Sequence, residues 1–362
     1  MERELLDILA CPRCGGALAV TISEEHDGDI VAGTLTCGCR ERYPIEDGVP
    51  YLLMGAAGTA RGTRLAPEEA AAALDALKLP EPERVTVANI YFHNVMAPDY
   101  EQDRSTKGIF GPTCQRRIDE AVQEMRSRTS GDVFLDIGCG TGNILGHAAR
   151  HFGRAIGMDV SPGMLALSRA RGLRVVGGAA DAIPFRPGTV DAVSVFSVLH
   201  HLYDPKALLA QIARVMKPGG VLYTDWDPNA DARRRMARVE WLRVGYGRAV
   251  GFATRVGRAL GLPMRSHLHT SEQEPLVELT EYHDKPGVGL DGQELRLELL
   301  RLGFRDVRVV CHWNSPSCRS ERTSVPRELP LAERAKAFAR MVLTMTFDPE
   351  ALAPLLLIMA QK

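Results

Sequence analysis

The stretch Val133-Phe-Leu-Asp-Ile-Gly-Cys-Gly-Thr-Gly-Asn143 constrains the fold more strongly than any other part of the chain. Its apolar start predicts a buried strand, which runs into three glycines at alternate positions. Gly138, Gly140 and Gly142 permit a sharp turn and let the backbone approach a ligand without an intervening Cβ. A helix that begins at Asn143 directs its N-terminal amides at the same place. We therefore expect an α/β sheet with a nucleotide-type site at the carboxyl edge of this strand.

The spacing of these glycines separates two kinds of nucleotide cofactor. A dinucleotide-binding turn has the pattern G-x-G-x-x-G and holds a pyrophosphate. Here the pattern is G-x-G-x-G, and Asp136 stands two residues before the first glycine. A carboxylate there repels a pyrophosphate but accepts hydrogen bonds from a cationic amino group, which S-adenosylmethionine has. The turn resembles the nucleotide-site signature of the class I S-adenosylmethionine-dependent methyltransferases, and a NAD-dependent enzyme is disfavoured.

Two further acids follow at the intervals that this resemblance requires. Asp159 ends the apolar segment 155–159, 23 residues after Asp136, where a carboxylate can bind both ribose hydroxyls. Asp181 follows the third expected strand, 173–178. The resemblance implies that Asp181 receives the adenine amino group and that the next backbone amide reads a ring nitrogen. Each acid alone is better explained as a solvated strand end or a helix cap, so the prediction depends on all of them together.

Later segments complete the resemblance. A fourth strand is expected at 191–196, the turn Lys217-Pro-Gly-Gly220 leads into a fifth, and two more lie at 304–310 and near Leu355. The family fold implied is a doubly wound, Rossmann-like seven-stranded α/β sheet with helical lid insertions. The cofactor-binding residues that the resemblance implies are Asp136, Gly138, Cys139, Gly140, Gly142, Asn143, Asp159, Val160, Met164, Asp181, Ala182 and Phe196.

Four cysteines near the start of the chain predict a metal site. Cys11 and Cys14 form one pair, Cys37 and Cys39 form another, and a hairpin-like region lies between the pairs. Two thiolate pairs brought together by a hairpin make a tetrahedral sulfur site that suits Zn²⁺. A domain of about fifty residues buries little core, so a metal would supply folding free energy.

The segments around these cysteines, 5–12 and 43–53, resemble the small zinc-ribbon activator subunit of tRNA-, rRNA- and release-factor-modifying methyltransferases. Here the ribbon is fused to its methyltransferase. The second pair is C-x-C, tighter than the C-x-x-C that is typical of ribbons. A ribbon that has kept its fold and lost its metal is therefore the alternative.

Charge and composition restrict the partners. Between Met1 and Met54 ten acids oppose four bases, a net charge of −6, so we expect this ribbon to pack on the catalytic domain or cover the cofactor site rather than clamp RNA. The whole chain has a net charge of −1 and no apolar run of about 20 residues, which argues against a membrane partner. Its start is too acidic for a secretion signal, so we expect a cytoplasmic protein whose cysteines are ligands or buried thiols.

These patterns predict three regions: a zinc-ribbon-like domain at 1–54, a linker and helix at 55–88, and a methyltransferase domain at 89–362. Within the last, a lid insertion is expected at about 228–291 and a second insertion at about 314–352. The first part of the lid is rich in arginine, which indicates either a solvated helix face or an anion site. Its later part contains His267, His269 and His283, which indicate pocket lining or a metal site.

Residues near the acceptor are less sharply defined. Tyr91 and Tyr100 are candidates to cover the cofactor, and either is also explained as core. His200 and His201 follow the fourth strand, where a histidine with a pKa near neutrality takes a proton from the acceptor; His201 is the first candidate. The pair also occurs in the resembled family as a structural feature.

We expect in-line SN2 transfer of a methyl group to an acceptor that is most simply a small metabolite. The alternatives are a tRNA or rRNA methyltransferase and a non-catalytic methyltransferase-like scaffold. The sequence leaves the acceptor atom and the oligomeric state open.

Overall fold

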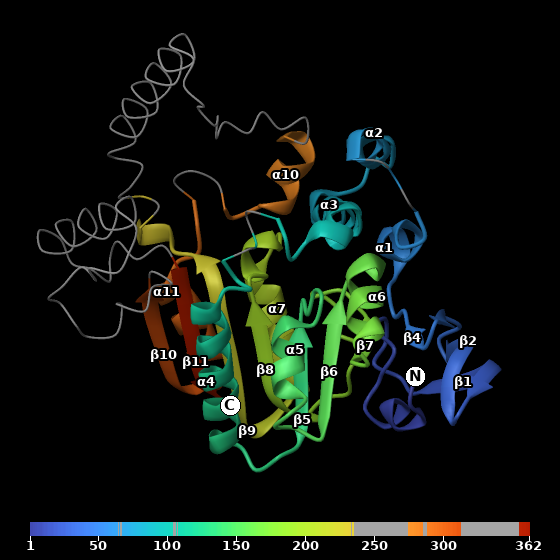
Figure 1. The fold of residues 1–362 in the computed structure, drawn as a ribbon, viewed down its shortest axis with the longest axis horizontal. Helices are drawn as coiled ribbons and strands as arrows, with labels where there is room; N and C mark the ends of the chain where they lie inside the picture. The colour runs from blue at the N-terminus through green and yellow to red at the C-terminus, as the bar shows by residue number, and fades with distance from the viewer. Residues whose placement is uncertain are drawn as a thin grey trace, which may run out of the picture.

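The computed structural model describes residues 1–63, 65, 67–103, 106, 108–232, 234, 274–284, 288–312 and 355–362. Within them the chain forms a four-stranded antiparallel sheet at its N-terminus and a seven-stranded mixed sheet, which lie side by side (Figure 1).

The large sheet has the strand order β10-β11-β9-β8-β5-β6-β7. Its strands are β5 (Val133–Ile137), β6 (Arg154–Asp159), β7 (Arg174–Gly177), β8 (Val190–Phe196), β9 (Met216–Pro228), β10 (Arg305–His312) and β11 (Leu355–Gln361). The strands from β5 to β9 are parallel, and β11 is antiparallel to both of its neighbours. The expected doubly wound, seven-stranded fold is confirmed. The turn expected at 217–220 lies inside the span of β9, where the pairing with β8 shifts register.

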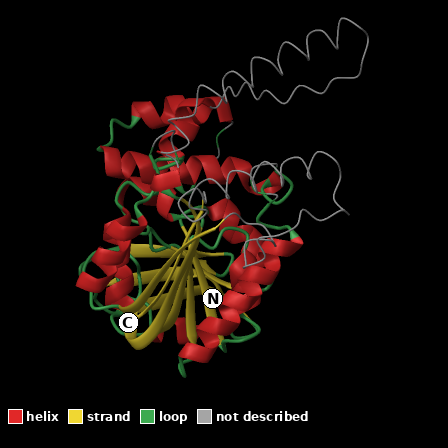
Figure 2. Ribbon diagram, turned by 90° about the vertical axis from the view of Figure 1, so that its left-hand side faces the viewer, coloured by secondary structure: helices red, strands yellow, loops and turns green. Residues whose placement is uncertain are grey.

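Helices cover both faces of this sheet (Figure 2). Sequence signals fix where they begin: Ser161 caps α6 by accepting a hydrogen bond from the Met164 amide, and Asp204 caps α7 by accepting one from the Lys206 amide. In both helices a proline follows the cap, at the first helical position. The helices flanking the sheet are α4 (Pro112–Arg128), α5 (Asn143–Ala148), α6 (Pro162–Ala170), α7 (Pro205–Val215) and α11 (Gly292–Arg301).

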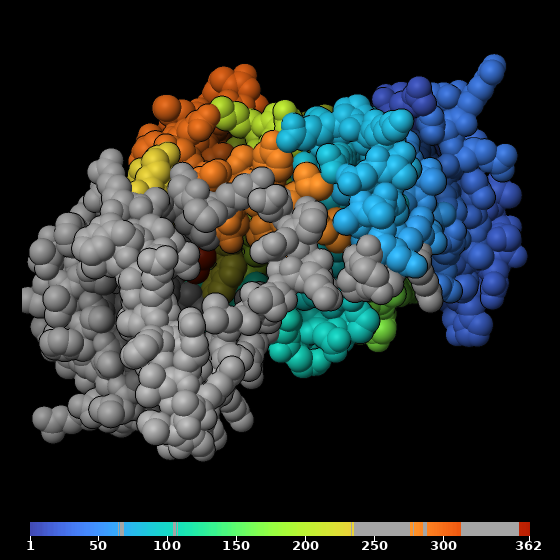
Figure 3. Space-filling model, turned by 90° about the horizontal axis from the view of Figure 1, so that it is seen from above, coloured from blue at the N-terminus to red at the C-terminus, as the bar shows by residue number. Residues whose placement is uncertain are grey.

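A second group of helices lies over the carboxyl edge of the sheet. It consists of α1 (Gly55–Ala60), α2 (Pro67–Ala76), α3 (Glu81–Met96) and α10 (Glu274–Thr280). Seen from above, α10 in orange lies beside the light-blue and cyan helices (Figure 3), and it contacts α3. Ala60, Leu74, Ile90 and Leu276 are buried in one apolar cluster among these helices. The expected linker therefore begins with a packed helix, and the expected boundary at residue 89 falls within α3. Short 3-10 helices lie at Arg3–Asp7, Ala97–Asp99 and Leu199–His201.

The N-terminal sheet contains β1 (Leu18–His26), β2 (Asp29–Cys37), β3 (Arg42–Glu46) and β4 (Val49–Pro50) in that order. It meets the large sheet at β7, where Tyr51 pairs with Gly177 and the Leu52 amide donates to the Gly177 carbonyl at 2.8 Å. Leu9 pairs with Phe185 on the other side of the junction. Both side chains are fully buried in a cluster that continues into the large sheet, so the two sheets share one core.

Charge complementarity accompanies this apolar contact. Acidic residues of the N-terminal domain face arginines of the large domain, in the pairs Glu2–Arg174 at 2.7 Å, Asp29–Arg169 at 3.2 Å and Glu4–Arg154 at 3.8 Å. Such partly exposed pairs contribute little stability individually. These ion pairs explain part of the excess of acidic residues in the N-terminal domain, because the acids in them face arginines of the large domain. Among the described residues, no helix is both long and apolar enough to cross a membrane.

The shared core gives the first prediction. Leu9→Ala should lower the free energy of unfolding by about 2–5 kcal/mol, because it leaves a cavity between the two sheets. Urea denaturation followed by circular dichroism measures this change. The control is Leu297→Ala on α11, where the leucine is 63% exposed and the expected change is within about 0.5 kcal/mol. Equal effects of the two substitutions would show that the N-terminal domain contributes no core to the rest of the protein.

Candidate functional site

A cavity of about 380 Å³ lies at the carboxyl edge of the large sheet. Its volume is in the range of small-molecule sites. Residues that follow β5, β6, β7 and β8 form its walls, while α3 and the start of α7 enclose the opposite side. Doubly wound sheets bind their ligands here, in the crevice outside the carboxyl ends of the parallel strands.

The glycine turn after β5 forms part of the wall. The amides of Gly138 and Cys139 both donate to the Met158 carbonyl, at 2.7 and 3.1 Å, which holds the turn against the end of β6. Gly140 has a φ of +52°, and a Cβ placed there would meet no atom within 4 Å, so its backbone borders open space. A Cβ on Gly138 or Gly142 would instead lie 2.3–2.4 Å from the side chains of Val198 or Leu173. Gly138 and Gly142 thus permit packing against neighbouring side chains, while Gly138 and Gly140 both line the cavity.

Two acids lie close behind this turn. Asp159 accepts hydrogen bonds from the amides of Gly140 and Ser161, both at 2.9 Å, and desolvation by burial raises its pKa. Asp136 is 2% exposed and accepts a hydrogen bond from the Ser194 hydroxyl at 2.5 Å. Burial, together with the nearby charge of Asp159, raises the pKa of Asp136 to about 7. Burial disfavours the ionised form of both carboxyl groups. A positively charged ligand group would stabilise that form, so this region favours a cation.

The expected cofactor residues divide between two neighbouring cavities. The larger cavity is lined by Gly138, Gly140, Asp159, Val160, Met164, Asp181 and Phe196. A smaller one of about 40 Å³ is lined by Asp136, Gly138, Cys139, Gly140, Asn143 and Phe196. Gly142 and Ala182 line neither cavity. Tyr100 lines both, whereas Tyr91 is buried in the helical cluster above the sheet.

The large cavity is also lined by Asn89, His93 and His201. Asn89 and His93 were not expected from the sequence, although their separation of four residues on α3 places them on one helical face. The Asn89 side-chain amide donates to the His201 carbonyl at 3.1 Å. The rings of His93 and His201 meet edge to face, with centroids 5.2 Å apart. Helix α3 therefore supplies polar groups to the wall of the cavity.

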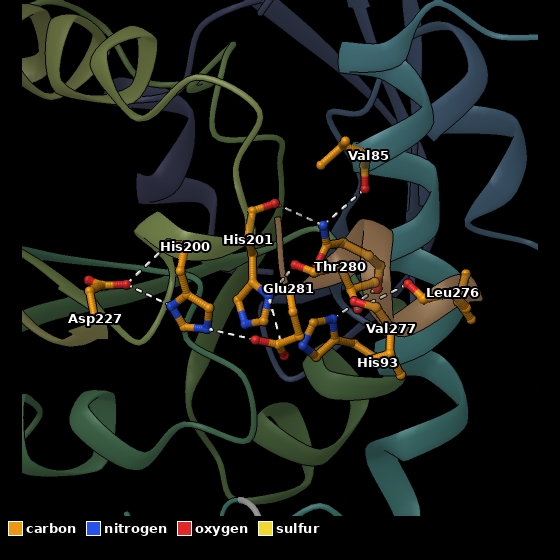
Figure 4. A network of polar contacts seen from close by, with 10 residues as sticks. Val85, His93, His200, His201, Asp227, Leu276, Val277, Thr280 and Glu281 are labelled. Carbon is orange, nitrogen blue, oxygen red and sulfur yellow. Dashed lines mark hydrogen bonds and ion pairs between the residues drawn. The ribbon is translucent and has the colours of Figure 1, made fainter. Parts of the chain in front are cut away.

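His200 and His201 occupy different environments (Figure 4). His201 lines the cavity, whereas His200 does not and is instead held by Asp227, with 2.8 Å between Nδ1 and Oδ1. Burial, followed by the charge of His200, lowers the pKa of His201 to about 3. The near-neutral pKa expected for His201 is therefore wrong, because sequence position does not report desolvation. Of the lid histidines, His283 donates its backbone amide to the His200 carbonyl, while His267 and His269 lie outside the described residues, as do most of the lid arginines.

The four cysteines near the N-terminus come together. The sulfur atoms of Cys14 and Cys37 are 3.4 Å apart and those of Cys11 and Cys39 are 3.7 Å apart. All four sulfurs lie within 4.8 Å of one another. Tetrahedral Zn–S bonds of 2.3 Å require sulfurs about 3.8 Å apart. The cluster therefore fits a structural Zn²⁺, and the tight C-x-C pair does not exclude Cys39 from it.

Comparison with known proteins gives two matches to family models. Residues 135–224 match a family described as "Methyltransferase domain", and residues 2–48 match "Trm112p-like protein". The first segment runs from β5 into β9 and includes the strand ends that form the cavity, and the second contains all four clustered cysteines. The expected resemblance is confirmed for both.

Individual relatives match shorter stretches. A tRNA (carboxymethyluridine(34)-5-O)-methyltransferase of Arabidopsis thaliana is 32% identical over 151 residues, covering 41% of this chain and 34% of that protein. A trans-aconitate 2-methyltransferase of Methylobacterium radiotolerans is 35% identical over 135 residues, covering 35% of this chain and 52% of that protein. The chain thus spans about a third to a half of these curated relatives. A solved complex of the Haloferax volcanii Trm112 methyltransferase activator with a methyltransferase covers 74% of this chain and 96% of that chain, at 19% identity and a TM-score of 0.43.

The raised pKa of Asp136 predicts how stability depends on pH. Its pKa is about 7 in the folded protein and about 3.9 when unfolded, so the folded state holds the proton more tightly. Below about pH 4, Asp136 is protonated in both the folded and the unfolded protein, so it does not lower the free energy of unfolding. Between about pH 4 and pH 7 the unfolded state gains by ionising, so wild-type stability should fall relative to Asp136→Asn, by at most about 4 kcal/mol.

Urea denaturation of both proteins from pH 4 to pH 8 measures this difference. Asparagine keeps an acceptor for Ser194, so the substitution tests the charge rather than the hydrogen bond. Asp181→Ala is the control, because Asp181 is exposed and its replacement should change stability by less than about 0.5 kcal/mol. A difference between wild type and Asp136→Asn that stays constant over this pH range would contradict the prediction.

Proposed function

We propose that this chain, which joins a Trm112p-like domain to a methyltransferase domain, transfers the methyl group of S-adenosylmethionine to a small-molecule acceptor. The observation that carries the proposal is the convergence of Asp136, Gly140, Asp159 and Asp181 on two adjoining cavities at one edge of the sheet. These residues follow or belong to three successive strands, and each offers a group that S-adenosylmethionine needs.

In this proposal the donor is held in three parts. Asp136, beside the smaller cavity, attracts the cationic amino group, because a positive charge there offsets the cost of ionising a buried carboxyl group. Asp159 takes the ribose hydroxyls and keeps the glycine turn closed through its bond to the Gly140 amide. Asp181, at the exposed end of the larger cavity, receives the adenine amino group. Phe196 and Tyr100 border both cavities and would enclose the junction between nucleoside and amino acid.

The protein's chemical task is then positional. The methyl group on a sulfonium is already activated, so the enzyme must align a nucleophile with the S–CH3 bond and exclude water, and alignment supplies several kcal/mol of the barrier. A base is not assigned to His200 or His201. A pKa of about 3 makes His201 a weak proton acceptor, and His200 does not line the cavity.

The size and lining of the site favour a small acceptor. Helix α3 and residues between Leu202 and Leu208 contribute to the lining, which is mostly apolar and has Asn89, His93 and His201 among its polar groups. The similarity to a trans-aconitate methyltransferase is consistent with a metabolite substrate. The alternative, an RNA acceptor, is favoured by the similarity to a tRNA methyltransferase. A non-catalytic scaffold is disfavoured, because it needs no full set of donor-binding acids.

The proposal is tested by incubating the purified, zinc-loaded protein with methyl-labelled donor and cell extract. Label in small metabolites that survives ribonuclease supports the proposal, and label in RNA supports the alternative. Donor binding without transfer to either fraction would indicate the scaffold. Absence of any affinity for S-adenosylmethionine in calorimetry would overturn the proposal as a whole.

Asp181 gives a specific prediction for donor binding. Asp181→Ala should raise the Kd for S-adenosylmethionine roughly tenfold or more, because a hydrogen bond to a charged group is lost, while stability stays unchanged. Isothermal titration calorimetry measures the affinity. Asp75→Asn is the matched control, since Asp75 lies on α2 and does not line the cavity. Equal affinities for both variants and the wild type would remove Asp181 from the site.

We also propose that Zn²⁺ occupies the four-cysteine cluster and stabilises the N-terminal domain. Cys14→Ser should remove about one equivalent of zinc, as measured by mass spectrometry, and lower the free energy of unfolding by several kcal/mol, on the order expected for a structural metal in a small domain. Cys311→Ser on β10 is the control and should keep the wild-type zinc content. If Cys14→Ser retains its zinc, the alternative of a ribbon without metal in this cluster is correct.

A further inference from the structure

A cluster of metal-binding side chains lies beside the large cavity and is separate from the cysteines. His200, His201 and Glu281 each offer one ligand atom, and these atoms lie within 4.8 Å of one another. The Nε2 atom of His200 is 3.5 Å from Oε2 of Glu281. Ligands at 2.0–2.1 Å from a tetrahedral ion lie about 3.3 Å apart, so this pair is already near the required separation.

Both imidazoles are oriented as metal ligands usually are. Nδ1 of His201 lies 2.7 Å from the carbonyl of Thr280, and because a carbonyl only accepts, this nitrogen carries the proton. Nδ1 of His200 lies 2.8 Å from Oδ1 of Asp227, which also accepts the His200 backbone amide at 3.1 Å. In the neutral rings the lone pairs are therefore on the two Nε2 atoms. The His201 nitrogen that lies 3.9 Å from Oε1 of Glu281 is Nδ1, so an ion bound through Nε2 requires a small shift of the partly exposed Glu281 side chain. A carboxylate or carbonyl on the other ring nitrogen is the arrangement that fixes the tautomer and orientation of metal-bound histidines.

The supporting groups come from several elements and are themselves fixed (Figure 4). Thr280 ends α10, and its hydroxyl donates to the carbonyls of Leu276 and Val277. Asn89 on α3 donates to the His201 carbonyl. Asp227 is at the end of β9 and fully buried. The groups around the two histidines therefore come from β9, α10, α3 and the turn after β8.

The cluster also offers carboxyl oxygens that have no cationic partner in the described part of the chain. Asp227 and Glu281 are two carboxyl groups placed around two histidines. Among the described residues, neither of them pairs with a lysine or an arginine, and Oδ2 of Asp227 is buried without a hydrogen-bond partner. The side chain of Glu281 is 30% exposed, so an ion has a path to the cluster.

We propose that His200, His201 and Glu281 bind a divalent transition-metal cation, with Asp227 as the positioning residue of His200. Two imidazoles and one carboxylate match the protein ligands of zinc sites that keep an open coordination position. His201 also lines the large cavity, whereas His200 and Glu281 do not, so the ion would lie beside that cavity. A role of the ion in binding an acceptor oxygen rests on the proposed function, whereas binding of the ion itself does not.

The test compares metal content in the full-length protein. Wild type, Glu281→Gln, His201→Gln and His147→Gln are loaded with excess Zn²⁺, desalted and analysed by mass spectrometry. His147 on α5 also pairs with a carboxylate, Asp119, and serves as the matched control. Glu281→Gln and His201→Gln should each bind about one equivalent less than wild type, and His147→Gln should not. Equal zinc content in all four proteins overturns the proposal.

Two measurements guard against loss of folding. When the wild type is titrated with Co²⁺, one bound equivalent should lack the sulfur-to-metal charge-transfer band, because the proposed site has no sulfur ligand. If every bound equivalent shows that band, the proposal fails, and this result requires no variant. Asp227→Asn should weaken the affinity for this second ion 10- to 100-fold. Glu281→Gln should bind S-adenosylmethionine as tightly as wild type, so failure of this inference remains distinguishable from failure of the proposed function.

Discussion

The hydrogen bond from the Gly140 amide to the Asp159 carboxylate connects the ends of β5 and β6. It depends on the parallel register of the two strands, which places the turn after one beside the last residue of the other. With the turn held there, Gly140 faces open space while Gly138 and Gly142 pack against side chains. Together with the bonds from the Gly138 and Cys139 amides to the Met158 carbonyl, it holds the turn and Asp159 at the wall of the cavity. Asp159 therefore supports the turn through this hydrogen bond and also lines the cavity.

Much of this arrangement was predictable because it is local. A glycine turn after a buried strand, and acids at the ends of the next strands, are written in short segments whose geometry follows from the sheet. The residues that were not expected come from elements distant in sequence. Asn89 and His93 reach the cavity on α3, and Glu281 reaches His200 from the segment after α10. No short pattern announces such contacts, because they depend on how helices pack above the sheet.

Electrostatic properties were the least predictable. His201 was expected to titrate near neutrality from its residue type and its position after β8. Its actual surroundings lower its pKa to about 3, because the ring is desolvated and lies against His200. Asp136 shows the same effect with the opposite sign, since burial raises the pKa of an acid. The spacing of Asp136 and His201 in the sequence predicted their positions at the ends of strands. Their pKa values depend on burial, which the spacing does not show.

The junction between the two sheets has a consequence for how the protein responds to zinc. Tyr51 and Leu52 pair with Gly177, the last residue of β7, and the next residues, from Gly178 to Asp181, line the cavity. Whatever stabilises the N-terminal sheet therefore also stabilises this part of the cavity wall, and the converse holds by thermodynamic linkage. Under the two proposals above, a shortage of zinc would lower the affinity of this protein for its donor, although the cysteine cluster does not line the cavity.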